Sequence, residues 1–220
     1  MPTSTVEDYL KCIYFEARST PGELVATGRI ASAMNVAPGT VTAMMKTLSE
    51  SGLIRYEPYA GVSLTDAGHK LATHVLRRHR LVELFLVEIM GMDWSEVHAE
   101  AEVLEHAVSE SLIDRIDEML GHPTVDPHGD PIPTAGGHVE EPDLLDLVTC
   151  QIGRPLSIAR VTDQRTEFLQ MLEKHGLMPG RRAEVESRDE LTETVCIRPE
   201  KGPSLQLAFH AAARILVDGG

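Results

Sequence analysis

The chain has 220 residues, of which 42% are hydrophobic and 25% are charged, the composition of a folded globular protein with one or two domains. Disordered, collagenous and membrane-embedded classes are excluded, because the composition is ordinary and no apolar run approaches the roughly 20 residues of a membrane span. The formal net charge of −14 argues at first sight against a nucleic-acid partner.

The charge is distributed unevenly along the chain. Residues 1–80 contain nine basic and seven acidic side chains, whereas residues 81–220 contain 11 basic and 27 acidic ones. The objection to a nucleic-acid partner therefore does not apply to the N-terminal third.

The cysteines and the N-terminus indicate a reducing compartment. Cys12, Cys150 and Cys196 are too few and too far apart for a disulfide framework or a CxxC metal knuckle. The first residues lack the basic and then apolar stretch of a signal peptide. A cytoplasmic protein without membrane contact is expected.

The first eighty residues have the pattern of a winged helix-turn-helix. Apolar residues at spacings of three and four predict helices over 5–19, 27–34 and 38–51. Short apolar stretches at 53–56 and 62–64, joined by a turn over 57–61, predict two strands. Three helices followed by a β-hairpin are typical of the winged form of this DNA-binding motif.

The third of these helices presents small and hydroxyl side chains on its outward face. Thr40, Thr42 and Ala43 are suited to base edges, thymine methyl groups or phosphates, and Lys46 to a phosphate. Winged helices also serve, less often, as dimerisation or protein-binding modules, and this alternative stays open. The residues expected to contact DNA are Arg29, Pro38, Gly39, Thr40, Thr42, Ala43, Lys46 and Tyr59.

The middle of the chain is helical and ends in a proline-rich segment. Helices are predicted from 65 to about 90, over 96–108 and over 109–120. Five of the 13 prolines fall between 122 and 142, a composition that predicts a linker. Beyond it, strand-like stretches at 156–161, 183–187, 194–197 and 215–217 around a helix over 166–175 predict a small β-rich barrel.

Histidine and glutamate side chains follow one face of the helix predicted over 96–108. His98, Glu102, Glu105 and His106 lie within one arc of about 100°, beside the apolar stripe that this helix must bury. Carboxylates at the edge of a core need partners, because burying an unpaired one costs several kcal/mol. A solvated acidic face is the alternative, and this helix alone does not decide between the two.

The preceding long helix favours the metal site. His79 and Glu83 are one turn apart, and Glu83 lies in a stretch over 81–87 that is too apolar to stay exposed. A salt bridge from a neighbouring arginine would also satisfy this carboxylate. Asp8 is ambiguous by itself, because Thr5-Val6-Glu7-Asp8 has the form of a capping box. Catalytic signatures such as HExxH, GxSxG and a phosphate loop are missing, so an enzyme is not expected.

Motifs in several parts of the chain occur in an order and spacing that together are specific. They are Val6-Glu7-Asp8-Tyr9-Leu10, the winged helix, and residues 79–83, 97–100, 102–106, 128–133 and 172–180. Together they resemble the family of the diphtheria toxin repressor and the manganese transport regulator, over essentially the whole chain.

The resemblance implies a mainly α fold with a small β component. A winged helix-turn-helix DNA-binding domain would cover 1–70, and a helical dimerisation and metal-binding domain with the proline-rich linker would cover 71–141. An SH3-like β-barrel would cover 142–220. The implied function is a homodimeric, metal-dependent transcriptional repressor that binds operator DNA and controls genes of metal uptake.

The resemblance also implies a primary metal site at Asp8, Glu102, Glu105 and His106. Iron-responsive members have methionine and cysteine at the first two positions, whereas manganese-responsive members have carboxylates, as here. Hard oxygen donors with one imidazole suit Mn²⁺, so Mn²⁺ is the expected cofactor, with Fe²⁺ and other divalent ions as further candidates.

A second metal site is implied at His79, Glu83 and His98. Some long manganese-type members add ligands from the linker and the SH3-like domain, which by position are Asp126, His128 and Asp163. Short manganese regulators carry an acidic residue where this chain has Lys11, so their two-metal cluster is not expected in the same form.

Two other classes of function remain as alternatives. A winged-helix regulator that ignores metals and senses an organic ligand would leave the histidines and glutamates as a solvated face. A metallohydrolase would use similar ligands but would leave Arg29, Lys46 and the wing without a purpose.

Overall fold

The computed structural model describes residues 3–20 and 22–218. Its chain separates into two compact units, the first formed by residues 1–79 with 133–139 and the second by residues 80–132 with 140–220. The first unit has one buried apolar core and the second has two. None of the helices in the described ranges has the length and apolarity that a membrane crossing requires.

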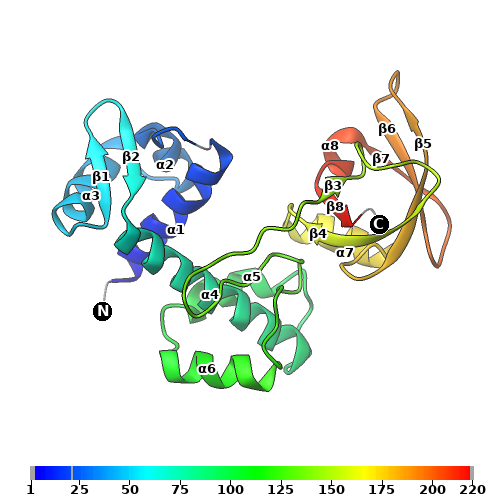
Figure 1. The fold of residues 1–220 in the computed structure, drawn as a ribbon. Coiled ribbons are helices and arrows are strands. Elements are labelled where there is room, and N and C mark those ends of the chain that lie inside the picture. Colours follow the sequence, from blue (N-terminus) through cyan, green and yellow to red (C-terminus); the bar gives the residue numbers. More distant parts are fainter. Residues whose placement is uncertain (1–2, 21, 219–220) are drawn as a thin grey trace. The chain divides into compact units, whose positions relative to one another are not determined.

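The first unit is the predicted winged helix-turn-helix. The helices α1 (Ser4–Ser19), α2 (Thr27–Ala33) and α3 (Pro38–Glu50) precede the strands β1 (Ile54–Glu57) and β2 (Gly61–Leu64), which pair antiparallel (Figure 1). Proline at the first position of α3 suits that helix start, since a first-turn N–H has no helical partner. Large apolar side chains from these helices fill the core, among them Leu10, Ile13, Ile30, Met45 and Leu48.

The capping box expected at Thr5 is wrong. The helix starts earlier, because the hydroxyl of Thr3 accepts a hydrogen bond from the Val6 N–H at 3.4 Å and caps α1 there. Glu7 is then the acidic residue of the first turn, and its carboxylate forms an ion pair with Arg78 at 2.6 Å. Asp8 lies beyond that turn, so capping does not explain it.

The helix α4 (Asp66–Glu88) begins in the first unit and ends in the second. Its C-terminal half packs with α5 (Val97–Leu104) and α6 (Glu110–Met119) around a core that includes Leu81, Leu86 and Ile113. The single helix predicted over 96–108 is too long, because the N–H groups of Ala107 and Val108 both turn back to the carbonyl of Leu104. Glu105 and His106 therefore lie in the turn after α5.

The proline-rich segment has no helix, as predicted, but it is not a free linker. Asp126, His128, Asp130 and Ile132 are buried, and a bridge between Val125 and Pro131 closes the loop that carries three of them. Glycine at 129 is required there, since φ is +85° and a Cβ would overlap the carbonyl oxygen of Ala159. The loop over 125–132 is thus part of the second unit's interior.

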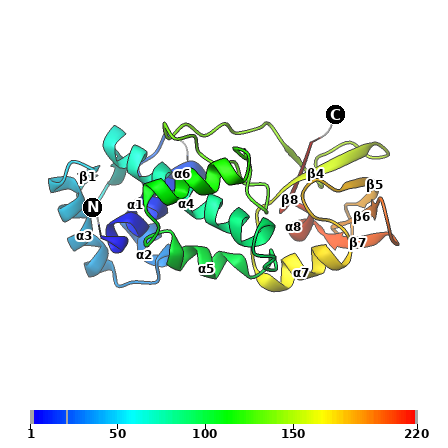
Figure 2. The same cartoon turned by 90° about the horizontal axis from the view of Figure 1, so that it is seen from below.

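The C-terminal part is a six-stranded antiparallel sheet in the order β3-β8-β4-β5-β6-β7. Its strands from β4 to β8 are labelled in Figure 2. The strands are β3 (Leu145–Asp146), β4 (Pro155–Val161), β5 (Arg182–Asp189), β6 (Thr194–Pro199), β7 (Leu205–Ala208) and β8 (Ile215–Asp218). The helix α7 (Thr166–Lys174) buries Leu169 and Leu172 against this sheet. The strands β3 and β7 and the helix α8 (Phe209–Ala212) were not predicted.

Gly68, in the first turn of α4, packs closely against the segment that leads into the β1–β2 hairpin, which is the wing. A Cβ at Gly68 would overlap the carbonyl oxygen of Leu53, so we expect Gly68→Ala to lower the free energy of unfolding by about 1–3 kcal/mol in urea denaturation. Gly28→Ala is the matched control, because that helical position has no atom within 4 Å. It should raise the free energy of unfolding by about 0.5–1 kcal/mol, and equal effects would contradict the packing described.

Candidate metal centre

The helix α4 carries Glu83 into the core of the second unit. Its apolar neighbours on the helix are buried, and Glu83 itself is only 1% exposed. A carboxylate at this depth needs a cation or hydrogen-bond donors around it. Two imidazoles flank it, with Nδ1 of His98 lying 3.1 Å from Oε1 and Nδ1 of His128 lying 3.9 Å from Oε2.

The tautomer of His128 follows from its surroundings. Nε2 lies 2.9 Å from the backbone carbonyl of Trp94, which can only accept, so Nε2 carries the hydrogen and Nδ1 keeps its lone pair. Burial lowers the pKa of His128 despite the nearby Glu83 carboxylate, and this favours the neutral ring. Nδ1 is buried without a hydrogen-bond partner and also lies 4.0 Å from Oδ1 of Asp126. A lone pair directed at two carboxylates suits a shared cation.

Asp126 fixes the loop that holds His128. Its Oδ1 accepts hydrogen bonds from the backbone N–H groups of His128 and Asp130, at 2.8 and 2.9 Å. Burial raises the pKa of the Asp126 carboxyl well above its ordinary value, and the carboxylates of Asp130 and Glu83 raise it further, although Arg80 opposes them. Without a metal ion, protonation of Asp126 is therefore easy.

Two arginines and an amide contact the carboxylates of Asp126 and Asp130. Nε of Arg80 lies 3.7 Å from Oδ2 of Asp126, and the guanidinium of Arg80 also donates to the carbonyl of Pro131. Arg160 forms an ion pair with Asp130, whose Oδ2 accepts a hydrogen bond from the Gln164 amide at 2.8 Å. None of these supporting residues was predicted from the sequence.

Glu83, Asp126 and His128 together form a candidate metal site inside the second unit, called here the buried cluster. Each offers one donor atom, and these atoms lie within 4.8 Å of one another. His98 adjoins Glu83 from the start of α5. Two carboxylates and an imidazole with an unpaired Nδ1 fit a hard divalent cation. The structure thus brings together four of the residues predicted for a second site.

The predicted primary-site residues lie in both units. Nε2 of His106 is 3.4 Å from Oε1 of Glu105, which is fully buried, and Oε1 of Glu102 is 3.7 Å from Nε2 of His98. These three predicted ligands therefore lie at or just after the end of α5. Asp8 lies half-buried on α1 in the first unit.

His79 and Asp163 are the remaining residues predicted for the second site. His79 is buried on α4, one turn before Glu83, in the first unit. The Asp163 carboxylate is held by Arg165, whose Nε and Nη2 donate at 2.9 and 2.6 Å. These hydrogen bonds lower the pKa of Asp163, and the structure does not bring it to Asp126 and His128.

Most of the predicted DNA-contacting residues lie on the open side of α3 and on the wing. The exposed ones are Pro38, Gly39, Thr40, Ala43, Lys46 and Tyr59. The hydroxyl of Thr42 donates to the Pro38 carbonyl at 3.0 Å. Arg29 is paired within the unit, with Glu16 at 2.6 Å and with the hydroxyl of Thr20 at 3.1 Å.

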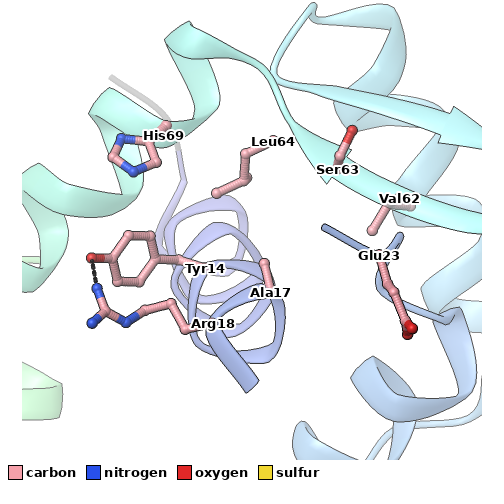
Figure 3. Close-up of a pocket in the computed structure, with 8 residues that line it drawn as sticks. All are labelled: Tyr14, Ala17, Arg18, Glu23, Val62, Ser63, Leu64 and His69. Carbon is pink, nitrogen blue, oxygen red and sulfur yellow. Dashed lines mark hydrogen bonds between the residues drawn. The ribbon is translucent and has the colours of Figure 1, made fainter. Parts of the chain in front are cut away.

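A hollow of about 520 Å³ lies between α1, β2 and the start of α4 (Figure 3). The buried Tyr14 ring lines it, with its hydroxyl accepting from Arg18 at 2.8 Å and the His69 ring 5.4 Å away. Glu23 lies at the other end (Figure 3). Its size suits a small molecule, but its charged side chains are exposed. The buried cluster is therefore the stronger candidate for a functional site.

Three family models match successive parts of the chain. They are described as "Iron dependent repressor, N-terminal DNA binding domain" at residues 1–62, "Iron dependent repressor, metal binding and dimerisation domain" at 65–134, and "FeoA domain" at 145–219. The matched ranges cover nearly the whole chain.

Named relatives and solved structures agree with these models. The chain is 34% identical over 200 residues to the iron-dependent repressor IdeR of Mycobacterium tuberculosis, covering 83% of this chain and 84% of the relative. It is 36% identical over 120 residues to the transcriptional regulator MntR of Lysinibacillus sphaericus, covering 54% and 84%. A manganese-dependent transcriptional repressor in complex with manganese has a TM-score of 0.86 at 38% identity, covering 97% of this chain and 99% of that one. ScaR with bound Cd²⁺ has a TM-score of 0.79 at 36% identity, covering 99% of each.

The raised pKa of Asp126 predicts a pH dependence of stability. A carboxyl whose pKa is raised on folding stabilises the protein at low pH, and this contribution is lost as pH rises through the folded pKa. In urea denaturation of metal-free protein from about pH 4 to about pH 8, the advantage of wild type over Asp126→Asn should fall with rising pH.

Asp163 supplies a control of opposite sign. Its pKa is lowered by hydrogen bonds from Arg165, so the advantage of wild type over Asp163→Asn should grow as pH rises from about 2 to about 5 and stay constant above that. The same sign for both variants would show that the buried environment of Asp126 is misjudged.

Proposed function

This chain belongs to the family of iron- and manganese-dependent transcriptional repressors, and from that premise we propose that it is a homodimer that binds operator DNA when it holds Mn²⁺ and thereby represses genes of metal uptake. The observation that carries the choice of metal is the donor chemistry. The buried cluster consists of Glu83, Asp126 and His128, and the acidic end of α5 adds further carboxylates and an imidazole. Oxygen donors with imidazole nitrogen suit Mn²⁺ better than thiolate or thioether sets do.

The primary site in this proposal consists of Asp8, Glu102, Glu105 and His106. Asp8 does not cap α1, because the hydroxyl of Thr3 does so. Glu105 supports the assignment because a fully buried carboxylate requires a compensating charge. His106 beside it adds the imidazole donor that a manganese site with mainly oxygen ligands can include.

The ligands of this site come from both units, and this suggests how metal controls DNA binding. When bound, the ion supplies positive charge and directed coordination to carboxylates that otherwise repel one another. Asp8 lies on α1, whose Leu10 and Ile13 belong to the core of the DNA-binding unit, so a restrained Asp8 restrains that unit. In the proposed dimer the two α3 helices would then keep the spacing of successive major grooves, about 34 Å. By linkage, operator DNA tightens metal binding by the same factor.

The second site in this proposal is the buried cluster with His98. His128 offers Nδ1 because the Trp94 carbonyl holds the hydrogen on Nε2. His79, one turn before Glu83, serves one of the two sites. Asp163 would join only by exchanging Arg165 for the ion. No catalytic role is proposed, since the named relatives are repressors.

Operator binding should require the primary ligands. We expect Mn²⁺ to tighten wild-type binding by about 5- to 150-fold over the same protein in EDTA, measured by fluorescence anisotropy at one salt concentration. Asp8→Ala and Glu102→Ala should lose most of this gain, because each removes an oxygen ligand. Glu173→Ala, an exposed carboxylate on α7, is the control and should keep it.

An operator affinity that is the same in EDTA and in saturating Mn²⁺ would refute the proposal. It would favour the metal-independent regulator, for which the hollow beside Tyr14 is the candidate ligand site.

The buried cluster should account for a second ion. In calorimetric titration with Mn²⁺, wild type should bind about two ions per chain and His128→Ala about one, because the variant lacks the Nδ1 donor. His210→Ala removes an exposed histidine on α8 and should still bind about two. Equal stoichiometry in wild type and His128→Ala would exclude this site.

A further inference from the structure

The turn before α5 places one aromatic side chain in the core of the β-rich part. Trp94 is 3% exposed, and the other buried members of this core include Val161, Leu169 and Leu172. Among the buried members of this core in the described chain, only Trp94 precedes residue 147. The turn that carries Trp94 therefore connects the helical part of the second unit with the β-rich core.

This side chain carries a cost that an apolar core does not require. The indole N–H of Trp94 is buried and has no hydrogen-bond partner among the described residues. A buried N–H of this kind normally has an acceptor, and phenylalanine or leucine would fill the core without one. An indole at this position indicates that the ring has a task besides filling space.

The ring of Trp94 lies against the imidazole of the buried cluster. It stacks on His128 with the ring centroids 5.5 Å apart and an interplanar angle of 28°, a favourable geometry for aromatic pairs. The Trp94 carbonyl accepts a hydrogen bond from Nε2 of the same imidazole at 2.9 Å. The main chain of His128 is held as well, because the Val161 N–H on β4 donates to its carbonyl at 2.8 Å. Trp94 thus sets the ring plane and the direction of Nδ1.

The turn itself is anchored to both α5 and α7. The Ser95 N–H donates to Oδ1 of Asp93 at 2.8 Å. The hydroxyl of Thr166, at the start of α7, donates to the Ser95 carbonyl at 3.2 Å. The helix α5 follows the turn and carries His98, whose Nδ1 lies 3.1 Å from Oε1 of Glu83. One short turn therefore helps to place both imidazoles that flank the buried carboxylate.

We propose that Trp94 is the positioning residue of the buried cluster, and that through it the β-rich part sets the affinity of this cluster for a divalent ion without donating a ligand. The inference rests on the second site of the proposed function. Groups that orient a ligating histidine typically contribute about 10- to 100-fold to metal affinity. Asp163, the ligand predicted from the β-rich part, is held by Arg165, so a connection without a ligand fits the structure.

Calorimetric titration of the full-length protein with Mn²⁺ tests the role of the ring. Trp94→Leu keeps an apolar side chain but loses the stack, so we expect the second ion to bind about 10- to 100-fold more weakly. The first ion should bind as in wild type. Trp94→Phe keeps an aromatic face against His128 and should bind the second ion nearly as tightly as wild type does.

Leu172→Ala separates positioning from a general loosening of the core. This side chain is fully buried in the same core on α7, so its truncation should lower the free energy of unfolding in urea. It should leave the affinity for the second ion at the wild-type value. A loss of second-ion affinity as large as that in Trp94→Leu would overturn the inference, as would wild-type affinity in Trp94→Leu.

Intrinsic fluorescence gives a second measurement that needs no substitution of Trp94. The chain has one tryptophan, so its emission reports Trp94 alone. An ion in the buried cluster should change this emission, because it changes the charge beside the imidazole stacked on the ring. The change should persist in Asp8→Ala and be absent in Glu83→Gln. An equal change in Glu83→Gln overturns the inference, as does constant wild-type emission while calorimetry shows two ions.

These results are independent of operator binding. If Mn²⁺ leaves the operator affinity unchanged but the second ion still depends on Trp94, the proposed control of DNA binding fails and the role of Trp94 stands. If wild type binds no second ion, the buried cluster is not a metal site and the role of Trp94 fails with it. Metal control through the primary site would then remain.

Discussion

The burial of one carboxylate governs the interior of the second unit. Glu83 lies in an apolar stretch of α4 at 1% exposure, and its negative charge must be balanced there. His98 lies beside it from α5 and His128 from the loop over 125–132. Because the Trp94 carbonyl holds the hydrogen on Nε2 of His128, the nitrogen that faces Glu83, Nδ1, has a lone pair and no hydrogen to donate. The site therefore favours a cation more than a hydrogen bond. Arg80 lies beside this site, against Asp126 and Pro131.

The same constraint ties the loop over 125–132 to the sheet. Asp126 holds the loop by accepting hydrogen bonds from two backbone N–H groups. Asp130, in the same loop, forms an ion pair with Arg160 on β4 and accepts a hydrogen bond from Gln164. Hydrogen bonds and an ion pair therefore link the Asp126 carboxylate, through Asp130, to the β-rich part. Two bound divalent ions would also offset four of the chain's fourteen net negative charges, so metal binding reduces the repulsion of DNA phosphates as well as ordering the chain.

Helical periodicity predicted the winged helix, and the cost of burying a charge predicted that Glu83 needs a partner, because both are local signals. Asp126 and His128 were named only through the family resemblance. The sequence did not predict the role of Trp94, since a backbone carbonyl leaves no mark on residue type. Asp163 was chosen by position, but Arg165, two residues further on, holds it in the structure. Glu105 and His106 were predicted on a helix but lie in the turn after it, because the helix ends at Leu104. The buried loop was mistaken for a linker because proline content indicates irregular structure and carries no information on burial.

The division of the chain has a practical consequence for fragments. The first unit includes residues 133–139, where the Pro133 carbonyl accepts a hydrogen bond from Arg77 at 2.8 Å, and the second unit resumes at 140. Neither unit is one continuous segment, so no single proteolytic cut separates the two units cleanly. A DNA-binding fragment that ends at residue 79 would lack residues 133–139, which belong to the same unit. Domain swapping of this unit would have to exchange two segments at once. Deletion mapping of this protein should therefore use internal loop replacements in place of truncations.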